Sequence, residues 1–186
     1  KLKVLLKKRE KEPFKNKYEL FGGLLKENES AKQCLKRKLK EVLNTDKFFF
    51  QQFHTFTEPK RDPRERIVSI GYIALIEKSN VKNLEEWFEI NNLSELAFDH
   101  KKIIERARSY LKDNISLFAK YLLPNKFPLN SLQEIYETIL EKTFDNRNFR
   151  KQMISSGIVK ETNELEKEVS HRPANPKGSP DFRMIR

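Results

Sequence analysis

Residues 22–46, GGLLKENESAKQCLKRKLKEVLNTD, join a pair of glycines, an acidic loop and an amphipathic helix. Leu35, Leu39 and Val42 are spaced four and three residues apart, so they lie on one face of that helix. Ser30 is a good start signal for it. The stretch therefore predicts a loop that leads directly into a helix.

The N-terminal half of the chain mixes strands with helices. The aromatic and β-branched content predicts strands over 2–9, 17–23, 48–56 and 66–77. Helical periodicity predicts helices over 30–43 and 99–113, the second with Asp99 as its cap. His54 and His100, within this half, are expected to be structural, and Cys34 to be packed in the interior.

After about residue 114 the strands give way to helices. Helices are predicted over 115–123, 130–142 and 146–157, and the tail reads as a strand, a polar loop and a strand. Asn130 with Gln133 resembles a capping box for the second helix, and Asp145 and Gly157 mark the start and end of the third. Three helices followed by a two-stranded ribbon is the element order of a winged helix-turn-helix.

The third of these helices is a candidate for reading DNA. Phe149 and Met153 are four residues apart and are expected to face inward with Ile154 beside them. Asparagine and arginine suit bidentate contacts to adenine and guanine. The predicted DNA-binding residues on the helix are Asn146, Arg147, Asn148, Arg150 and Lys151, and those in the loop between the last strands are His171 and Arg172. The alternatives are a solvated basic helix face and a merely charged hairpin.

Composition limits the classes of function. The net charge of +11 and the pI near 9.6 suit a polyanion-binding protein, but equally a protein from a lysine-rich proteome. No run of about 18 apolar residues and no signal peptide is visible. Cys34 is the single cysteine, which excludes an internal disulfide and a multi-cysteine zinc site and suits a reducing, cytoplasmic compartment.

The opening stretch resembles the Nudix box, the loop–helix motif of the Nudix hydrolases. The matching positions are Gly23, Glu29, Arg37, Leu39 and Glu41. Lys38 and Val42 stand where the family has glutamates, and Asn44 where it has glycine. Positions 38, 41 and 42 share one side of a helix, and in the family their carboxylates hold magnesium against a pyrophosphate.

Magnesium needs hard oxygen ligands, and in this chain Glu41 is the one carboxylate left of the three. We therefore expect no enzymatic activity, no metal and no cofactor. Glu41 is then expected to serve as an ion-pair partner of Arg37, four residues earlier.

A second stretch narrows the resemblance. Residues 55–75, TFTEPKRDPRERIVSIGYIAL, are similar to the segment after the box in the NrtR group of Nudix-related transcriptional regulators, and so are LAFDH (96–100), DNRNFRKQM (145–153) and HRPAN (171–175). The resemblance implies a bacterial, homodimeric regulator that binds a double-stranded DNA operator. Its fold would be α+β, with a Nudix-like α/β/α sandwich over 1–113 and a winged helix-turn-helix over 114–186. We expect a further strand before Lys1, and the PKGSP segment (176–180) departs from the group's tight wing.

The same resemblance implies a small-molecule effector instead of a substrate. Typical effectors are ADP-ribose and, in sugar-utilising relatives, pentoses such as L-arabinose. The predicted effector-binding residues are Arg9, Glu19, Arg61, Asp62 and Arg64. Arg61 and Asp62 are alternatively a turn-stabilising ion pair before Pro63. Two other functions stay open: an active hydrolase of nucleoside diphosphate-linked sugars, and a basic protein that binds nucleic acid without sequence preference.

Overall fold

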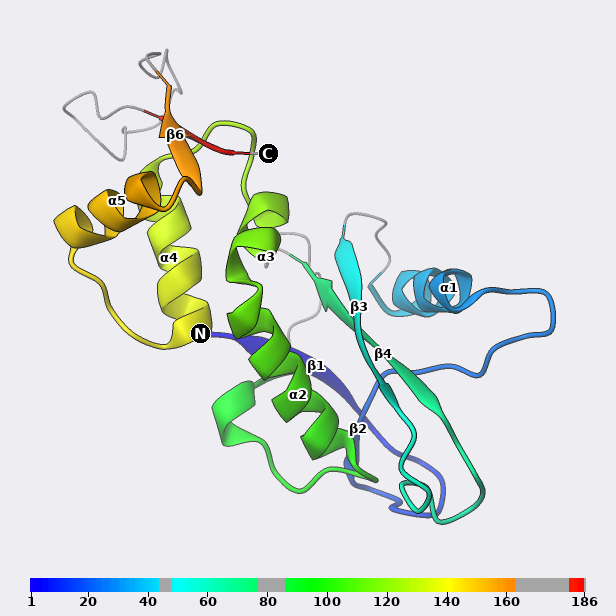
Figure 1. Ribbon diagram of the computed structural model, residues 1–186. Coiled ribbons are helices and arrows are strands. Elements are labelled where there is room, and N and C mark those ends of the chain that lie inside the picture. The colour runs from blue at the N-terminus through cyan, green and yellow to red at the C-terminus, as the bar shows by residue number, and fades with distance from the viewer. Residues whose placement is uncertain (44–47, 77–85, 163–180, 186) are drawn as a thin grey trace. The chain divides into compact units, whose positions relative to one another are not determined.

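The computed structural model describes residues 1–43, 48–76, 86–162 and 181–185 (Figure 1). The chain separates into two compact units, Lys1–Leu111 and Lys112–Arg186. The first unit mixes strands with helices, and in the second three helices precede a two-stranded ribbon. Within the residues that the structure describes, no helix is long and apolar enough to cross a membrane.

A three-stranded antiparallel sheet in the order β2-β1-β5 carries the start of the chain. Its strands are β1 (Lys3–Lys8), β2 (Tyr18–Leu20) and β5 (Trp87–Glu89). Leu6 pairs with Leu20, and it is buried with Leu96 and Ile104 in the core of this unit. The strands predicted within 2–9 and 17–23 are confirmed.

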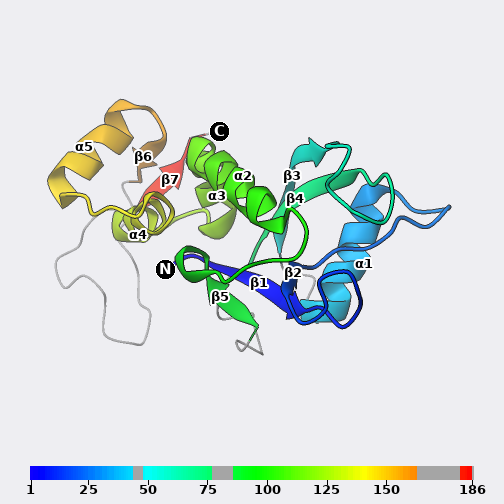
Figure 2. The ribbon, with the colours of Figure 1, turned by 90° about the horizontal axis from the view of Figure 1, so that it is seen from below.

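A second antiparallel pair, β3 (Phe49–Phe56) and β4 (Ser69–Leu75), forms a long hairpin. Figures 1 and 2 show α1 (Ala31–Leu43) and α2 (His100–Asp113) on opposite sides of this hairpin. A Cβ atom at Gly71 would lie 2.8 Å from the Phe53 ring, so only glycine fits there beside the bulge in β3. The short 3-10 helix Ile90–Asn92 follows β5. The predicted strands and helices are all present.

The helix α1 begins as its sequence predicts. The backbone N–H of Ser30 donates to Gln33 Oε1 at 2.7 Å, and the Gln33 N–H donates back to Ser30 Oγ at 3.4 Å. This reciprocal pair satisfies donors that the first turn of a helix leaves without partners. Asp99 directly precedes α2, at the predicted cap position. Both of its carboxylate oxygens accept hydrogen bonds from Arg61.

The second unit holds α3 (Ile115–Leu122), α4 (Leu129–Leu140), α5 (Asn146–Ser155) and the antiparallel strands β6 (Val159–Glu161) and β7 (Phe182–Met184). Its core is made by Ala119, Phe127, Leu132, Tyr136, Phe149, Met153, Val159 and Phe182. Asp145 caps α5 by accepting from the Asn148 N–H at 3.0 Å, as predicted. Gly157 ends it with a φ of 69°, a conformation that favours glycine.

Two sequence expectations in this unit are wrong. The predicted capping box of Asn130 and Gln133 does not form, because α4 begins one residue earlier and has Pro128 at its N-cap. The side chain of Gln133 points instead to the turn before α5. Ile154 is 41% exposed, since the buried face of α5 is already filled by Phe149 and Met153.

Candidate effector site and nucleic-acid interface

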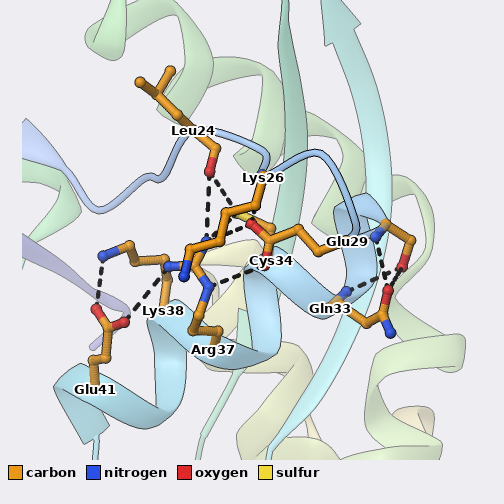
Figure 3. Close-up of polar contacts among 9 residues, drawn as sticks. Leu24, Lys26, Glu29, Gln33, Cys34, Arg37, Lys38 and Glu41 are labelled. Carbon is orange, nitrogen blue, oxygen red and sulfur yellow. Dashed lines mark hydrogen bonds and ion pairs between the residues drawn. The ribbon is translucent and has the colours of Figure 1, made fainter.

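The loop before α1 is bound to that helix by an arginine–glutamate pair (Figure 3). Arg37 Nε donates to Glu29 Oε2 at 3.0 Å, and its Nη2 donates to Glu29 Oε1. The hydrogen bonds from Arg37 lower the pKa of the Glu29 carboxyl from 4.5 to about 2. The buried Cys34 lies beside this pair, and burial raises the pKa of its thiol. Two positions of the box motif therefore hold the loop to the helix.

A lysine–glutamate ion pair occupies the face of α1 where the box has its other carboxylates. Lys38 Nζ lies 2.7 Å from Glu41 Oε2, and this contact with Lys38 is the main reason why the pKa of Glu41 is lowered. Arg37 Nη1 lies farther from Glu41, at 3.6 Å. The predicted Arg37–Glu41 pair thus exists, but Glu29 is the main partner of Arg37. Gly23 lies against the Lys38 stem, where a Cβ atom would be 2.9 Å from Cγ.

Among the described residues, no group of three His, Cys, Asp or Glu side chains is placed to hold a metal ion. Val42 supplies no oxygen, and the carboxylate of Glu41 is held by the Lys38 ammonium. A magnesium ion prefers several oxygen ligands in octahedral geometry. The residues present on this face do not fit such an ion.

The predicted effector residues occupy a separate cluster in the same unit. Arg9 Nη1 lies 2.9 Å from Glu19 Oε2, and its Nε donates to the carbonyl oxygen of Pro13 at 2.6 Å. Glu19 is buried, and Lys7 Nζ lies 3.2 Å from its other oxygen. Strands β1 and β2 pair Lys7 with Glu19, so the sheet itself places these charges side by side.

The loop 57–68 contributes two further ion pairs. Asp62 is buried and accepts from Arg64 Nε at 2.9 Å, and this partner lowers the pKa of the Asp62 carboxyl. Arg61 instead contacts Asp99, with Nε–Oδ2 and Nη2–Oδ1 distances of 2.9 and 2.8 Å, and it donates to Ser69 Oγ. The alternative of an Arg61–Asp62 pair is therefore wrong, because each residue has a different partner.

Phe98 connects these pairs, and sequence reasoning missed it as a site residue. The guanidinium carbons of Arg9 and Arg64 lie 4.8 and 5.2 Å from its ring centroid, and the Phe14 ring contacts it at 4.9 Å. Such arginine–aromatic contacts hold a guanidinium in place. Phe98 has a φ of 54°, which bulky residues adopt rarely. The LAFDH segment was the only sequence signal for it.

The two predicted structural histidines differ in environment. His100 Nδ1 accepts a hydrogen bond from the Leu20 N–H at 3.0 Å, and burial lowers the pKa of its imidazole. A neutral ring is required for that acceptance, so this histidine supports the β2 end of the cluster. His54 is exposed and its ring contacts Phe56 at 4.8 Å.

Two of the predicted DNA-reading residues on α5, Asn146 and Arg150, contact other side chains of the same unit. Arg147, Asn148 and Lys151 are exposed, as expected for a surface that meets DNA. Arg150 forms an ion pair with Glu161 and lies 5.5 Å from the Phe182 ring, so the ribbon holds it. Asn146 Oδ1 accepts from Gln133 Nε2. His171 and Arg172 lie outside the described residues.

Comparisons with known proteins divide the chain in the same way. The model of the NUDIX domain matches residues 1–107, and the model of the NrtR DNA-binding winged helix domain matches residues 119–176. The chain is also 34% identical over 185 residues to the "ADPR responsive transcriptional repressor NtrR" of Acinetobacter baylyi, covering 93% of this chain and 74% of the relative. The chain belongs to the NrtR family. The two-domain α+β fold predicted from the sequence is thereby confirmed.

Solved structures support the same assignment. A crystal structure of Shewanella oneidensis NrtR in complex with a 27mer DNA matches with a TM-score of 0.75 and 26% identity, over 98% of this chain and 86% of that one. The Nudix domain is 34% identical over 108 residues to the ADP-ribose pyrophosphatase of Methanocaldococcus jannaschii, covering 55% of this chain and 64% of the relative. The NrtR family thus combines a domain related to hydrolases with a DNA-binding winged helix.

Proposed function

We propose that the chain is a transcriptional repressor. Residues 114–186 bind a DNA operator in this proposal, and residues 1–113 sense ADP-ribose or a similar nucleoside diphosphate-linked sugar without hydrolysing it. The observation that carries sensing without hydrolysis is the Lys38–Glu41 ion pair on the box helix. It places an ammonium where a metal-dependent hydrolase needs a cation bound by several oxygens.

Hydrolysis would need more than the one remaining carboxylate. A metal in a hydrolase activates water and polarises the phosphoryl oxygen, and both roles require a fixed coordination shell. Both oxygens of Glu29 accept from Arg37, so this carboxylate holds the loop to the helix. Val42 is apolar. The box therefore acts as a structural loop–helix element in this proposal.

The diphosphate of the effector would be recognised by cations of the Arg9–Arg64 cluster. The Arg64 side chain is 48% exposed, whereas that of Arg61 is 6% exposed, donates to Asp99 through Nε and Nη2, and donates to Ser69 Oγ through Nη1. We therefore assign Arg64 to effector contact and Arg61 to holding the loop in place. Arg9, Glu19 and Asp62 would fix the Arg64 and Phe98 positions.

ADP-ribose is the first candidate because the Acinetobacter relative is described as ADPR responsive. The paired charges also suit a diphosphate, which binds guanidinium groups through charge-assisted hydrogen bonds. A free pentose such as L-arabinose would use the neutral and acidic groups alone. The assembly that we propose is a homodimer, since two-fold readers of this kind place half-sites about 34–36 Å apart or a multiple of that spacing.

The test combines binding with turnover. Calorimetric titration of the full chain with ADP-ribose and with L-arabinose should show binding of the first, and Arg64→Met should weaken it about tenfold, the loss of one charge-assisted contact. Lys60→Met, an exposed neighbour that removes the same charge, is the matched control. Incubation with ADP-ribose and magnesium should release no AMP.

Three results would contradict individual elements of the proposal. Steady release of AMP that Glu41→Gln abolishes would establish the alternative, an active hydrolase. Binding of L-arabinose but not of ADP-ribose would change the effector and leave the regulator function in place. A monomeric mass at micromolar concentration, with and without operator DNA, would exclude the homodimer.

A further inference from the structure

A polar network around the buried Gln133 joins α4 to the first residue of α5. Gln133 is 8% exposed, and its Nε2 lies 3.0 Å from each of three oxygens: Glu137 Oε1, the Phe144 carbonyl oxygen and Asn146 Oδ1. The Phe144 N–H donates to the same Glu137 oxygen at 2.9 Å. One buried amide on α4 therefore contacts the next turn of its own helix, the loop after it and the start of α5.

The neighbouring acceptors determine how the side-chain amides of Gln133 and Asn146 are oriented toward each other. A backbone carbonyl can only accept a hydrogen bond, and so can an ionised carboxylate. The hydrogen bonds from Gln133 and Phe144 lower the pKa of Glu137, so it is ionised at neutral pH. The group that Gln133 turns toward these two acceptors must be its NH2. The atom of Asn146 that meets this NH2 is then its oxygen, and the Asn146 NH2 is directed away from Gln133.

This orientation restricts what Asn146 can recognise. Bidentate reading of adenine needs the oxygen and the NH2 of one asparagine on the same base edge. The Asn146 oxygen is turned to the protein, so the outward end of its amide is a donor only. A donor near the start of a helix suits a phosphate oxygen, where the helix N-terminus also favours negative charge.

We propose that Asn146 donates to a DNA backbone phosphate and does not read a base, and that Gln133 and Glu137 are the positioning residues that set this role. Arg147, the next residue, is exposed and keeps the role of base reader. The proposal rests on the DNA-binding function proposed above. It assigns adjacent residues of one helix to different components of the duplex.

The experiment uses the full chain and a randomised duplex library, from which the wild type selects its preferred sequence. Binding of that duplex and of a shuffled duplex is then measured by fluorescence anisotropy, with circular dichroism of each variant. Asn146→Asp keeps an oxygen that accepts from Gln133, removes the outward donor and adds a negative charge. Asn130→Asp, an exposed position on α4, adds the same charge away from the network and is the matched control.

Asn146→Asp should lower the affinity for both duplexes about tenfold or more, as expected when a donor to a charged oxygen is lost. Asn130→Asp should change either affinity by less than about threefold. The sequence selected by Asn146→Ala should keep the wild-type preference at every base pair. If Gln133→Leu retains the wild-type dichroism spectrum, it should lower the affinity for both duplexes as Asn146→Ala does.

Two outcomes overturn the assignment while leaving the regulator function intact. The first is a loss of preference at one base pair in the Asn146→Ala selection with unchanged affinity for shuffled DNA, which would make Asn146 a base reader. The second is equal affinity of Asn146→Asp and Asn130→Asp. If the wild type selects no sequence at all, the proposed repressor function fails and the assignment of Asn146 fails with it.

Discussion

Replacing Asp99 by alanine would leave a buried guanidinium without its carboxylate. The side chains of Arg61 and Asp99 are 6% and 13% exposed, and two N–O contacts of 2.8 and 2.9 Å join them. Removing one partner of a buried ion pair costs about 3–5 kcal/mol, because the other charge stays desolvated. Arg61 keeps its hydrogen bond to Ser69, so we expect a loss near the lower end, about 3 kcal/mol.

Urea unfolding followed by tryptophan fluorescence measures this loss in the correct unit. Trp87 is the only tryptophan of the chain and lies in β5, within the same unit as Asp99. Glu95→Ala is the matched control. Its carboxylate lies 2.8 Å from Lys17, the same distance as in the Arg61–Asp99 pair, but its side chain is 82% exposed. An exposed pair contributes little to stability, so the control should unfold at the wild-type urea concentration.

A double variant separates the pair from its surroundings. Arg61→Met with Asp99→Leu removes both charges and keeps apolar volume, so the double variant should be more stable than Asp99→Ala alone. A penalty for the buried Arg61 charge is refuted if Asp99→Ala and Glu95→Ala shift the urea midpoint equally. Equal stability of Asp99→Ala and the double variant would also refute it, since the charge left behind would then destabilise nothing.

Further predictions concern the core of the second unit, the box loop and the DNA contacts. Phe149→Ala should cost about 3–5 kcal/mol of stability in far-ultraviolet dichroism melts, because the ring is 1% exposed and fully packed. The pKa of Glu29 should be about 2 in an NMR titration and return toward 4.5 in Arg37→Met. A depressed carboxyl pKa contributes stability above about pH 4.5 that is lost as pH falls toward 2, and Arg37→Met should remove that dependence. Arg147→Ala should cost about 1–3 kcal/mol of binding free energy on the selected site and remove the sequence preference at one base pair. Lys151→Ala should lower the affinity for every duplex and reduce the slope of log affinity against log salt concentration by roughly one.

The local features of this chain follow from short stretches of its sequence. The helices could be predicted because apolar residues recur at helical spacing, and the start of α5 because Asp145 precedes it directly. The Glu29–Arg37 pair was not predicted, although both residues match the box motif. Its spacing matched a known loop–helix element, while the i,i+4 rule favoured Glu41 as the partner. The structure places Glu29 closer because the loop before the helix folds back onto it.

The error at Arg61 has the same kind of cause. From sequence neighbours, Asp62 was the natural partner, but the turn directs the two side chains apart and Asp62 accepts from Arg64 instead. Asp99 is 38 residues away from Arg61 and meets it because α2 starts beside the loop 57–68. Phe98 likewise gained a role only when its ring was found between Arg9 and Arg64.

By itself the sequence determined the family, the residues that replace the box glutamates at positions 38 and 42, and the type and order of the elements except β5 and the short 3-10 helix after it, because these depend on residue identity and on spacings within one turn of helix or one strand. The tertiary structure alone decided which charges meet and which are exposed. Arg150 is bound by Glu161 and Asn146 is turned by Gln133 because β6 and α4 pack beside α5. Such contacts depend on the path of the backbone between distant residues, and no local pattern in the sequence records that path.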